Sequence, residues 1–474
     1  MASAEPTQGL EISTETRSAV RLLVGDALVN GQAVVYDEHL ADSIGPRLTG
    51  STNYARAVEW AQKQFEALGL SQVHTEVWVI PDAWQPKTVA TGRILTPVQH
   101  ELHIYSVGWG PSTPPHGVEG EVIYVPSMDI AALDQQKAQL AGAVALIDDA
   151  SFSAAHSADQ IFPAIQHLRS LGIKALLVPG GANGTEVSDS RNFSGSIDPL
   201  PEAQIGIEDL LLIKRLLPRS HVRVEFSFTN SIRRNAPVAN VVAQIPGAAL
   251  PDEVVLVGAH LDSWQPGTGA QDNGTGVSMV LEAARGIAAL RRPPRRTVRF
   301  VLFGGEEQGL LGSSAYVRAH KAELRNIDAV LVADSGSEAA KGWYIMGRDD
   351  EKGSVDALKP LLAGLGADDL SSNSDFLFQS DHAPFEVNGV PTLVLWTATD
   401  KYERLHHKAS DTFDSVVQKD LSQDAAVVAV TAYAIADSKE RFAPLLSDSE
   451  VRAMLQAAHH LDEYQYLHVN GVLP

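Results

Sequence analysis

The stretch Arg296–Ser313, RTVRFVLFGGEEQGLLGS, changes from a β-like to a helix-like pattern around two glycines and two adjacent glutamates. The apolar run Val298–Phe303 is typical of a buried β-strand. Two neighbouring acids, such as Glu306 and Glu307, are common on a solvated turn. Here they follow a strand that is predicted to be buried. Whether the two glutamates have a function therefore depends on which other residues lie at that end of the sheet.

The sequence around this stretch predicts an α/β fold. Val- and Leu-rich segments at 253–260, 297–303 and 327–333 alternate with helical patterns, of which residues 276–290 are the clearest. Strands with continuous apolar sequence are typical of a mostly parallel sheet that helices cover on both faces. In such sheets, ligands bind at the rim formed by the carboxyl ends of the strands. We therefore expect a mostly parallel mixed sheet with a functional rim.

A second module interrupts this pattern. Between about residues 94 and 228, short β-like segments are separated by turns rich in glycine and proline, such as WGPSTPPHG. The predicted division has four parts. These are the N-terminal part of the main domain (1–94), a β-rich insertion (95–228), the rest of the main domain (229–440) and a C-terminal helical extension (441–474).

Composition restricts the possible functions. The 474 residues include 58 Asp and Glu against 37 Lys and Arg, which gives a formal net charge of -21. Such a charge repels nucleic acids and anionic membrane surfaces. There is no run of about 18 apolar residues, so no membrane span is expected. The chain has no cysteine, so a metal site would use His, Asp and Glu.

Acids and histidines follow several of the predicted strands. His260 and Asp262 end one strand, two residues apart and on the same side of an extended backbone, and Asp334 follows another. Each residue alone is ordinary: a single His at a strand end is usually a packing residue, and Asp272 in TGAQDNGTG would pass for a turn aspartate. Their coincidence on one predicted rim, together with Glu306 and Glu307, is not ordinary.

A late loop, RLHHKASDT, can close over the same rim and brings His406 and His407. One early His and Asp, Glu307, Asp334 and one of these two histidines would provide five oxygen and nitrogen donors. That set suffices for two divalent ions that share a carboxylate, and it suits Zn²⁺ or, less specifically, Mn²⁺ or Co²⁺. One of the two adjacent glutamates is then left without a metal.

Six motifs together resemble a known family. AHLDSW, AQDNGTG, GGEEQGLLGS, ADSGS, SDHAPF and HHKASDT are similar, in order and spacing, to the motif series of the M28 co-catalytic zinc peptidases. The upstream segment DSIGPRLTGSTNYARAVEWAQKQFEALGL and the turn PPHGVEGEVIYV resemble the carboxypeptidase Q branch, whose peptidase domain contains an inserted protease-associated domain. The resemblance covers roughly residues 30–440.

The resemblance implies a zinc-peptidase fold with two Zn²⁺ ions per chain. His260 and Asp334 would bind one ion, Glu307 and His407 the other, and Asp272 would bridge them. His407 is chosen because the ligand of the family stands four residues before the aspartate of the DT pair.

The resemblance also assigns catalytic roles. Glu306 would be the general base that takes a proton from a metal-bridging water, and Asp262 would orient His260. Many members of the family have a tyrosine, thought to stabilise the oxyanion, immediately before the last His ligand. This chain has His406 there, and we expect the same role for it.

The implied activity is that of a di-zinc exopeptidase acting on dipeptides or short peptides with a free N-terminus. The resemblance further implies a homodimer. The N-terminus, MASAEPTQGLEIS, lacks the basic and apolar regions of a signal peptide, so we expect either a secreted or periplasmic protein whose signal peptide has been removed or, as the alternative, a cytoplasmic protein. Two other functions stay open. A single-zinc acyltransferase like the glutaminyl cyclases would need fewer ligands, and a receptor-type binding module would lack the complete set that is present here.

Overall fold

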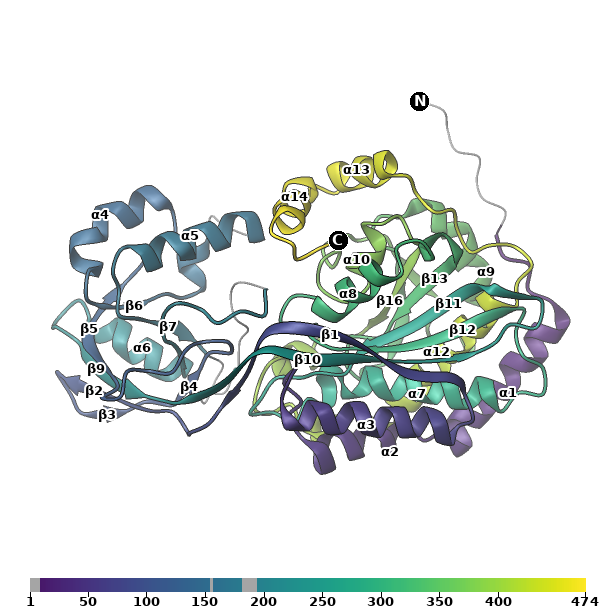
Figure 1. Ribbon diagram of the computed structural model, residues 1–474, viewed down its shortest axis with the longest axis horizontal. Helices are drawn as coiled ribbons and strands as arrows, with labels where there is room; N and C mark the ends of the chain where they lie inside the picture. The colour runs from purple at the N-terminus through teal and green to yellow at the C-terminus, as the bar shows by residue number, and fades with distance from the viewer. Residues whose placement is uncertain (1–8, 154–156, 181–193) are drawn as a thin grey trace.

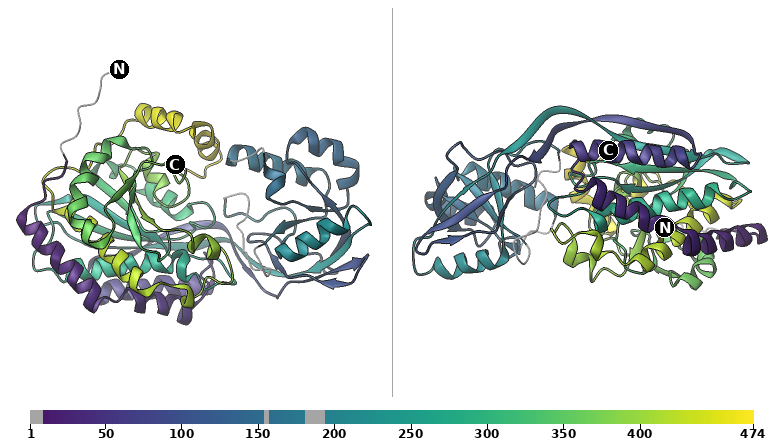
Figure 2. Two further views of the ribbon diagram at one scale, coloured as in Figure 1. Left: turned by 180° about the vertical axis from the view of Figure 1, so that it is seen from behind. Right: turned by 90° about the horizontal axis from the view of Figure 1, so that it is seen from below.

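Two mixed β-sheets and the helices around them form the protein (Figure 1). The computed structural model describes residues 9–153, 157–180 and 194–474. The long strands β1 (Ser71–Pro86) and β10 (Asn230–Ile245) pair along their length and run from the first sheet towards the second. Figure 2 shows the same connection from behind and from below. The chain therefore leaves the first sheet through β1 and returns through β10.

The first sheet has the strand order β1-β10-β12-β11-β13-β16-β14-β15. Its central strands β12, β11, β13 and β16 are parallel, whereas β10 and β14 run antiparallel to their central neighbours. This confirms the predicted mixed sheet of an α/β fold, in which the parallel pairs lie mainly at the centre. The remaining strands of this sheet are β11 (Leu250–His260), β12 (Arg296–Phe303), β13 (Ile327–Val332), β14 (Ala340–Tyr344), β15 (Asp369–Ser371) and β16 (Thr392–Thr397).

Helices cover both faces of this sheet, because successive strand residues point to opposite sides. Val255 and Val257 face one core, together with α1, α3, α7 and α12, while Leu256 faces the other, together with α8 and α10. The helices in this part of the chain are α1 (Thr14–Asn30), α2 (Ala33–Glu38), α3 (Thr52–Ala67), α7 (Thr275–Ala288), α8 (Leu311–Ala319), α9 (Lys352–Leu362), α10 (Ala383–Glu386), α11 (Tyr402–Leu405) and α12 (Gln418–Asp437).

The second sheet has the order β3-β2-β9-β5-β6-β7-β8-β4. It begins at Thr91, slightly before the boundary predicted at residue 95, and ends at Ser227. One face packs on α6 and the other on α4 and α5. Its elements are β2 (Thr91–Thr96), β3 (His100–Glu101), β4 (Ile104–Ser106), β5 (Val118–Tyr124), α4 (Ile130–Leu140), β6 (Val144–Leu146), α5 (Ala158–Ser170), β7 (Ala175–Pro179), β8 (Glu202–Ile205), α6 (Ile207–Leu216) and β9 (Arg223–Ser227).

The C-terminal extension contains two helices, α13 (Asp448–Ala457) and α14 (Leu461–Val469). They lie on the side of the first sheet that carries α8 and α10 (Figure 1). Helix α14 faces the second sheet and its helices, which are called the second unit below. Within the described ranges, every helix is too short or too polar to span a membrane.

A buried arginine ties the start of β12 to the rest of the first sheet. Arg296 is 1% exposed, and its Nε lies 2.7 Å from Glu253 Oε2 and 3.2 Å from the buried Asp328 Oδ2. Its Nη1 donates to the carbonyl oxygen of Ser438 at 2.6 Å, just after α12. A buried charge of this kind is tolerated only when it is paired with an opposite charge. The buried Asp328 carboxylate is therefore stabilised by Arg296.

We expect Arg296→Ala to lower the free energy of unfolding by about 3–5 kcal/mol, because it leaves the Asp328 carboxylate buried with fewer partners. Urea unfolding followed by far-UV circular dichroism measures this change. Arg291→Ala, at an exposed position in the same arginine-rich segment, is the matched control. An Arg296 variant as stable as that control would contradict the role given to this ion pair.

Candidate active site

The carboxyl ends of the central strands meet at one rim, as the sequence predicts. His260 is the last residue of β11, Glu306 and Glu307 follow β12, and Asp334 follows β13. The loop after β16 brings His407 to the same place. Asp272 comes from the short helical turn η4 (Ala270–Gly274), which leads into α7. The structure thus brings together all five predicted metal ligands and Glu306.

Asp272 lies at the centre of this group. Its Oδ1 is 3.2 Å from His260 Nε2, and its Oδ2 is 3.3 Å from His407 Nε2. Each histidine also faces a second carboxylate: His260 Nε2 is 3.3 Å from Asp334 Oδ1, and His407 Nε2 is 2.9 Å from Glu307 Oε2. The two oxygens of one aspartate therefore face two separate pairs of a histidine and a carboxylate.

The donor atoms of these residues fit divalent cations. Glu307 Oε1 and Asp334 Oδ1 are buried and have no hydrogen-bond partner in the described structure. Burial raises the pKa of Glu307 to about 8, and nearby Asp272 acts in the same direction. Burial also raises the pKa of Glu306 well above its usual value. Orphaned carboxylate oxygens among imidazoles are what a bound cation would satisfy, and the mixed oxygen and nitrogen donors suit Zn²⁺.

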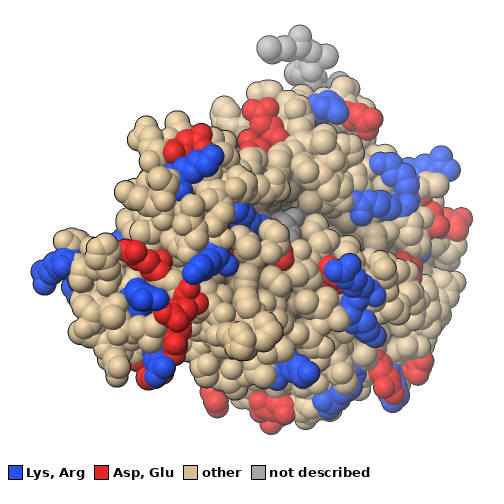
Figure 3. Space-filling view, turned by 60° about the vertical axis from the view of Figure 1, so that its left-hand side comes forward, with Lys and Arg blue, Asp and Glu red and all other residues tan. Residues whose placement is uncertain are grey.

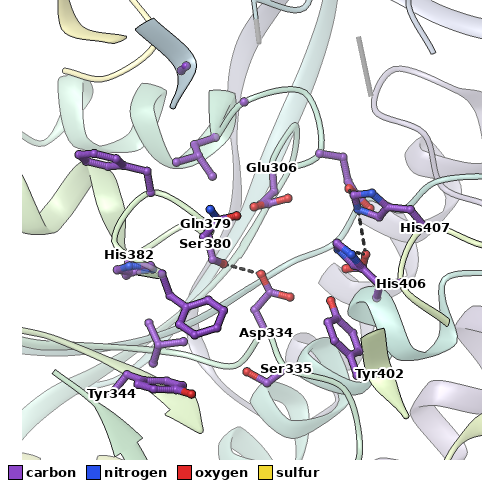
Figure 4. A pocket seen from close by; sticks show the side chains of 18 of the residues that line it. Glu306, Asp334, Ser335, Tyr344, Gln379, Ser380, His382, Tyr402, His406 and His407 are labelled. Carbon is purple, nitrogen blue, oxygen red and sulfur yellow. Dashed lines mark hydrogen bonds and ion pairs between the residues drawn. The ribbon is translucent and has the colours of Figure 1, made fainter. Parts of the chain in front are cut away.

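Glu306 differs from Glu307 in its surroundings. Its Oε2 is 4.0 Å from His260 Nε2, the longest of the ion-pair distances within this group, and its side chain is 11% exposed. In Figure 4 its carboxylate lies above Asp334 on the wall of the pocket, away from His407. The two adjacent glutamates thus point to different places, with only Glu307 in contact with His407.

Asp262 contacts both the strand end and the loop that carries Glu306. Its carbonyl oxygen is 3.1 Å from His260 Nδ1, and its Oδ1 is 3.6 Å from the same nitrogen. The Glu306 backbone N–H also points to this Oδ1, at 3.4 Å. The Thr49 hydroxyl donates to Asp262 Oδ2 and accepts from the Gly305 N–H, both at 2.8 Å. Sequence reasoning missed Thr49, although the GPRLTGS stretch that contains it lies in the upstream segment that resembles the carboxypeptidase Q branch.

Two further residues that sequence reasoning did not assign to the site hold the loop of Asp272. Asp411 accepts hydrogen bonds from the backbone N–H groups of Gln271 and Asp272, at 2.6 and 3.1 Å. The fully buried Arg47 donates to the carbonyl oxygen of Gly269 at 2.8 Å. Two features of the sequence could have pointed to these residues. Asp411 stands four residues after His407, and Arg47 lies in the upstream segment that resembles the carboxypeptidase Q branch.

The two neighbouring histidines lie close to Asp272. Their ring centroids are 3.7 Å apart, and His406 Nε2 is 3.6 Å from Asp272 Oδ2. His407 has a left-handed backbone conformation, with φ of 57°. This conformation is rare for a residue with a Cβ atom and is typical of functional sites. His406 is 45% exposed and lies towards the pocket opening, whereas His407 is more deeply placed and contacts Glu307.

The SDHAPF motif forms another part of the wall. Ser380 Oγ donates to Asp334 Oδ2 at 2.5 Å, which leaves Oδ1 facing His260. His382 is fully buried, and burial lowers its pKa to about 4, so that its imidazole is neutral at pH 7. In Figure 4, His382 and Ser380 lie on the opposite side of Asp334 from His406.

These residues line a pocket with a cavity of about 360 Å³. The face shown in Figure 3 is hollowed near its middle, and basic and acidic side chains are interspersed around it. The lining of the pocket includes the acids Asp272, Glu306 and Asp334 as well as the aromatic residues Tyr344, Phe376 and Phe378. A cavity of this size and lining suits a small ligand with a charged group and an apolar group.

Comparisons with known proteins agree with this geometry. The model of Peptidase family M28 matches residues 240–432, which include every rim residue described above. Carboxypeptidase Q of Bos taurus is 31% identical over 405 residues, which are 85% of this chain and 84% of that protein. Aminopeptidase YwaD of Bacillus subtilis is 25% identical and covers 83% of this chain and 82% of its own length.

Solved structures show the same architecture. A peptidase M28 precursor from Shewanella amazonensis SB2B superposes with a TM-score of 0.80 at 26% identity, covering 91% of this chain and 99% of its own. BSAP, a zinc aminopeptidase from Bacillus subtilis, has a TM-score of 0.67 at 21% identity, covering 88% of this chain and 98% of its own, and supports the fold alone. With sequence similarity along most of its length and the motif residues gathered on one rim, the chain belongs to peptidase family M28.

Proposed function

We propose that the chain is a di-zinc exopeptidase that hydrolyses dipeptides or short peptides with a free N-terminus. The observation that carries this proposal is the position of Asp272, whose two oxygens face His260 and His407 on opposite sides. A carboxylate in that position can bridge two ions. The names of the relatives, a carboxypeptidase and aminopeptidases, support the peptidase activity.

The contacts on the rim support two ligand sets. His260 and Asp334 would bind one zinc ion, and Glu307 and His407 the other, with Asp272 shared between them. His and carboxylate donors without thiolates suit zinc, and BSAP, whose fold is similar, is described as a zinc aminopeptidase. When bound, the ions would lower the pKa of a water molecule and polarise the scissile carbonyl group.

Glu306 is the proton carrier in this mechanism. Its carboxylate accepts a proton from the attacking water and then donates it to the amine of the leaving group. Its position supports the role, because it lines the pocket and stands farther from the histidines than the proposed ligands do. Asp262 helps to hold both His260 and the Glu306 backbone in place, through contacts that also involve Thr49.

Two carboxylates that line the pocket outside the proposed ligand set, Glu306 and Glu403, support a substrate with a free amino group. A protonated α-amine would be attracted to these two carboxylates, whereas a blocked amine would lose this attraction. His406, at the pocket opening beside Asp272, is proposed to donate to the oxyanion that forms at the attacked carbonyl.

The domain division predicted from the sequence belongs to the same proposal. Residues 95–228 would be a protease-associated domain that shapes access to the pocket, beside the peptidase domain formed by residues 1–94 and 229–440. A homodimer and a secreted or periplasmic location are proposed from the similarity to carboxypeptidase Q.

Glu306→Gln should keep its bound zinc but lose peptide hydrolysis by about 10²–10⁴-fold or more, because the amide cannot accept the proton. Zinc analysis by plasma mass spectrometry and a dipeptide assay on the same sample give both numbers. An active Glu306→Gln variant would contradict the assignment of the base.

Glu307→Gln should instead lose one of the two zinc ions, because a neutral amide is a much weaker ligand than a carboxylate. Glu403→Gln, which neutralises a carboxylate outside the proposed ligand set, is the matched control and should keep both ions. Equal zinc content in the Glu306, Glu307 and Glu403 variants would show that the two neighbouring glutamates do not differ as proposed.

N-acetylated dipeptides should be cleaved at least about tenfold more slowly than the same dipeptides with a free amine, since an ion pair to the amine is lost. Chromatographic measurement of kcat/KM on matched pairs tests this. Equal rates on free and blocked substrates would remove the exopeptidase part of the proposal.

A further inference from the structure

The pocket has an apolar end opposite the proposed metal ligands. In Figure 4, Tyr344 lies on the far side of Asp334 from His406 and His407. Phe376 and Phe378 also line the cavity, and so do three residues of the C-terminal extension, Leu467, Val472 and Leu473, which pack in one core cluster with Tyr344 and Phe378. The extension therefore reaches the site, although only a helical extension was expected there from the sequence.

Hydrogen bonds fix the extension to the helix that follows the glutamate pair. Ser314 Oγ donates to the carbonyl oxygen of Val472 at 2.9 Å, and Arg318 Nη2 donates to that of Gly471 at 2.8 Å. Both donors lie on α8, which begins shortly after Glu306 and Glu307. This part of the pocket wall is therefore held at a fixed distance from the residues that carry out the chemistry.

The same extension is fixed to the second unit. The Glu463 side chain on α14 accepts from the backbone N–H of Ala158, the first residue of α5, at 3.2 Å. A carboxylate at a helix N-terminus is electrostatically favourable. The rings of Tyr466 and Phe162 pack beside these residues, with centroids 6.1 Å apart. Helix α14 thus fills the space between the two units at the apolar end of the pocket.

The C-terminal extension also contacts the segment that carries Phe376 and Phe378. The rings of His460 and Phe378 make an edge contact, with centroids 5.5 Å apart. Leu467, Val472 and Leu473 are 5%, 7% and 2% exposed. Their side chains are fully packed, so they form a wall of defined shape. Both α14 and α5 lie outside residues 240–432, the part of the chain that matches the family model.

We propose that the segment Leu461–Leu473, called the pocket wall below, is a specificity-determining element that limits the size of the apolar side chain accepted at the N-terminal residue of the peptide. The proposal rests on the exopeptidase function proposed above. The free amine of the substrate would lie at the acidic end and its side chain at the apolar end. The pocket wall closes that end and leaves no room for side chains that extend beyond it.

The substitutions Leu467→Ala and Leu473→Ala should each enlarge the apolar end of the pocket. The test measures kcat/KM on dipeptides that differ only in the N-terminal residue, which is Ala, Leu, Phe, Trp or Lys. The unmodified protein should prefer Leu to Ala by at least about tenfold, since each extra methylene group in an apolar pocket is worth roughly 10–200-fold in selectivity. Each variant should raise the ratio of Trp to Leu by about tenfold and leave the rate on the Ala dipeptide nearly unchanged.

Val469→Ala is the matched control, because Val469 lies on the same helix but is 83% exposed. It should leave every ratio unchanged. Retained activity on the Ala dipeptide shows that a variant is folded. As a second approach, Ala158→Leu adds volume at a residue of α5 that lines the pocket beside the pocket wall, and it should lower the ratio of Phe to Ala. Unchanged Trp-to-Leu ratios in both leucine variants would overturn the proposal.

Binding measurements separate this inference from the proposed function. Calorimetry with leucine amide and tryptophan amide on the Glu306→Gln protein reports pocket size without hydrolysis, and Leu473→Ala in that background should strengthen tryptophan amide binding relative to leucine amide. A shifted binding ratio without hydrolysis by the unmodified protein would refute the peptidase proposal alone. Hydrolysis with unshifted ratios in both assays would refute the pocket wall alone.

Discussion

The site depends on the position of Asp272 between two histidines that belong to distant parts of the chain. Its oxygens face His260 from the end of β11 and His407 from the loop after β16. Each histidine has a second carboxylate beside it, so several buried negative charges meet in a small volume. Bringing such groups together without a counter-charge is costly. The two proposed cations would offset this cost, and they would explain why several carboxylates lie together on the rim.

The rest of the structure keeps these charges in place. The parallel central strands bring their carboxyl ends to one edge, and η4 places Asp272 between His260 and His407. Residues from far along the chain then fix the loops: Thr49 joins Asp262 to the loop of Glu306, and Asp411 holds the backbone of Asp272. The N-terminal segment is therefore a structural part of the site, although none of its residues is a proposed ligand.

The sequence predicted the rim well because strand direction and apolar periodicity are local signals. The run before Glu306 had to be a buried strand, and the parallel arrangement then placed His260 and Asp334 beside it. Local signals could not reveal Thr49 or Arg47, since their contacts depend on how the N-terminal segment packs against loops about two hundred residues later. The contribution of Leu467 and Leu473 to the pocket likewise depends on tertiary packing, because an amphipathic helix does not indicate which surface it will cover.

The central claim is that Asp272 bridges two zinc ions. Anomalous X-ray diffraction from crystals of the zinc-loaded protein, collected on both sides of the zinc absorption edge, tests it most directly. The account predicts two anomalous peaks separated by about 3.5–4 Å, one between His260 and Asp334 and the other between Glu307 and His407, with an Asp272 oxygen bound to each. A single peak, or two peaks that Asp272 does not join, would contradict it.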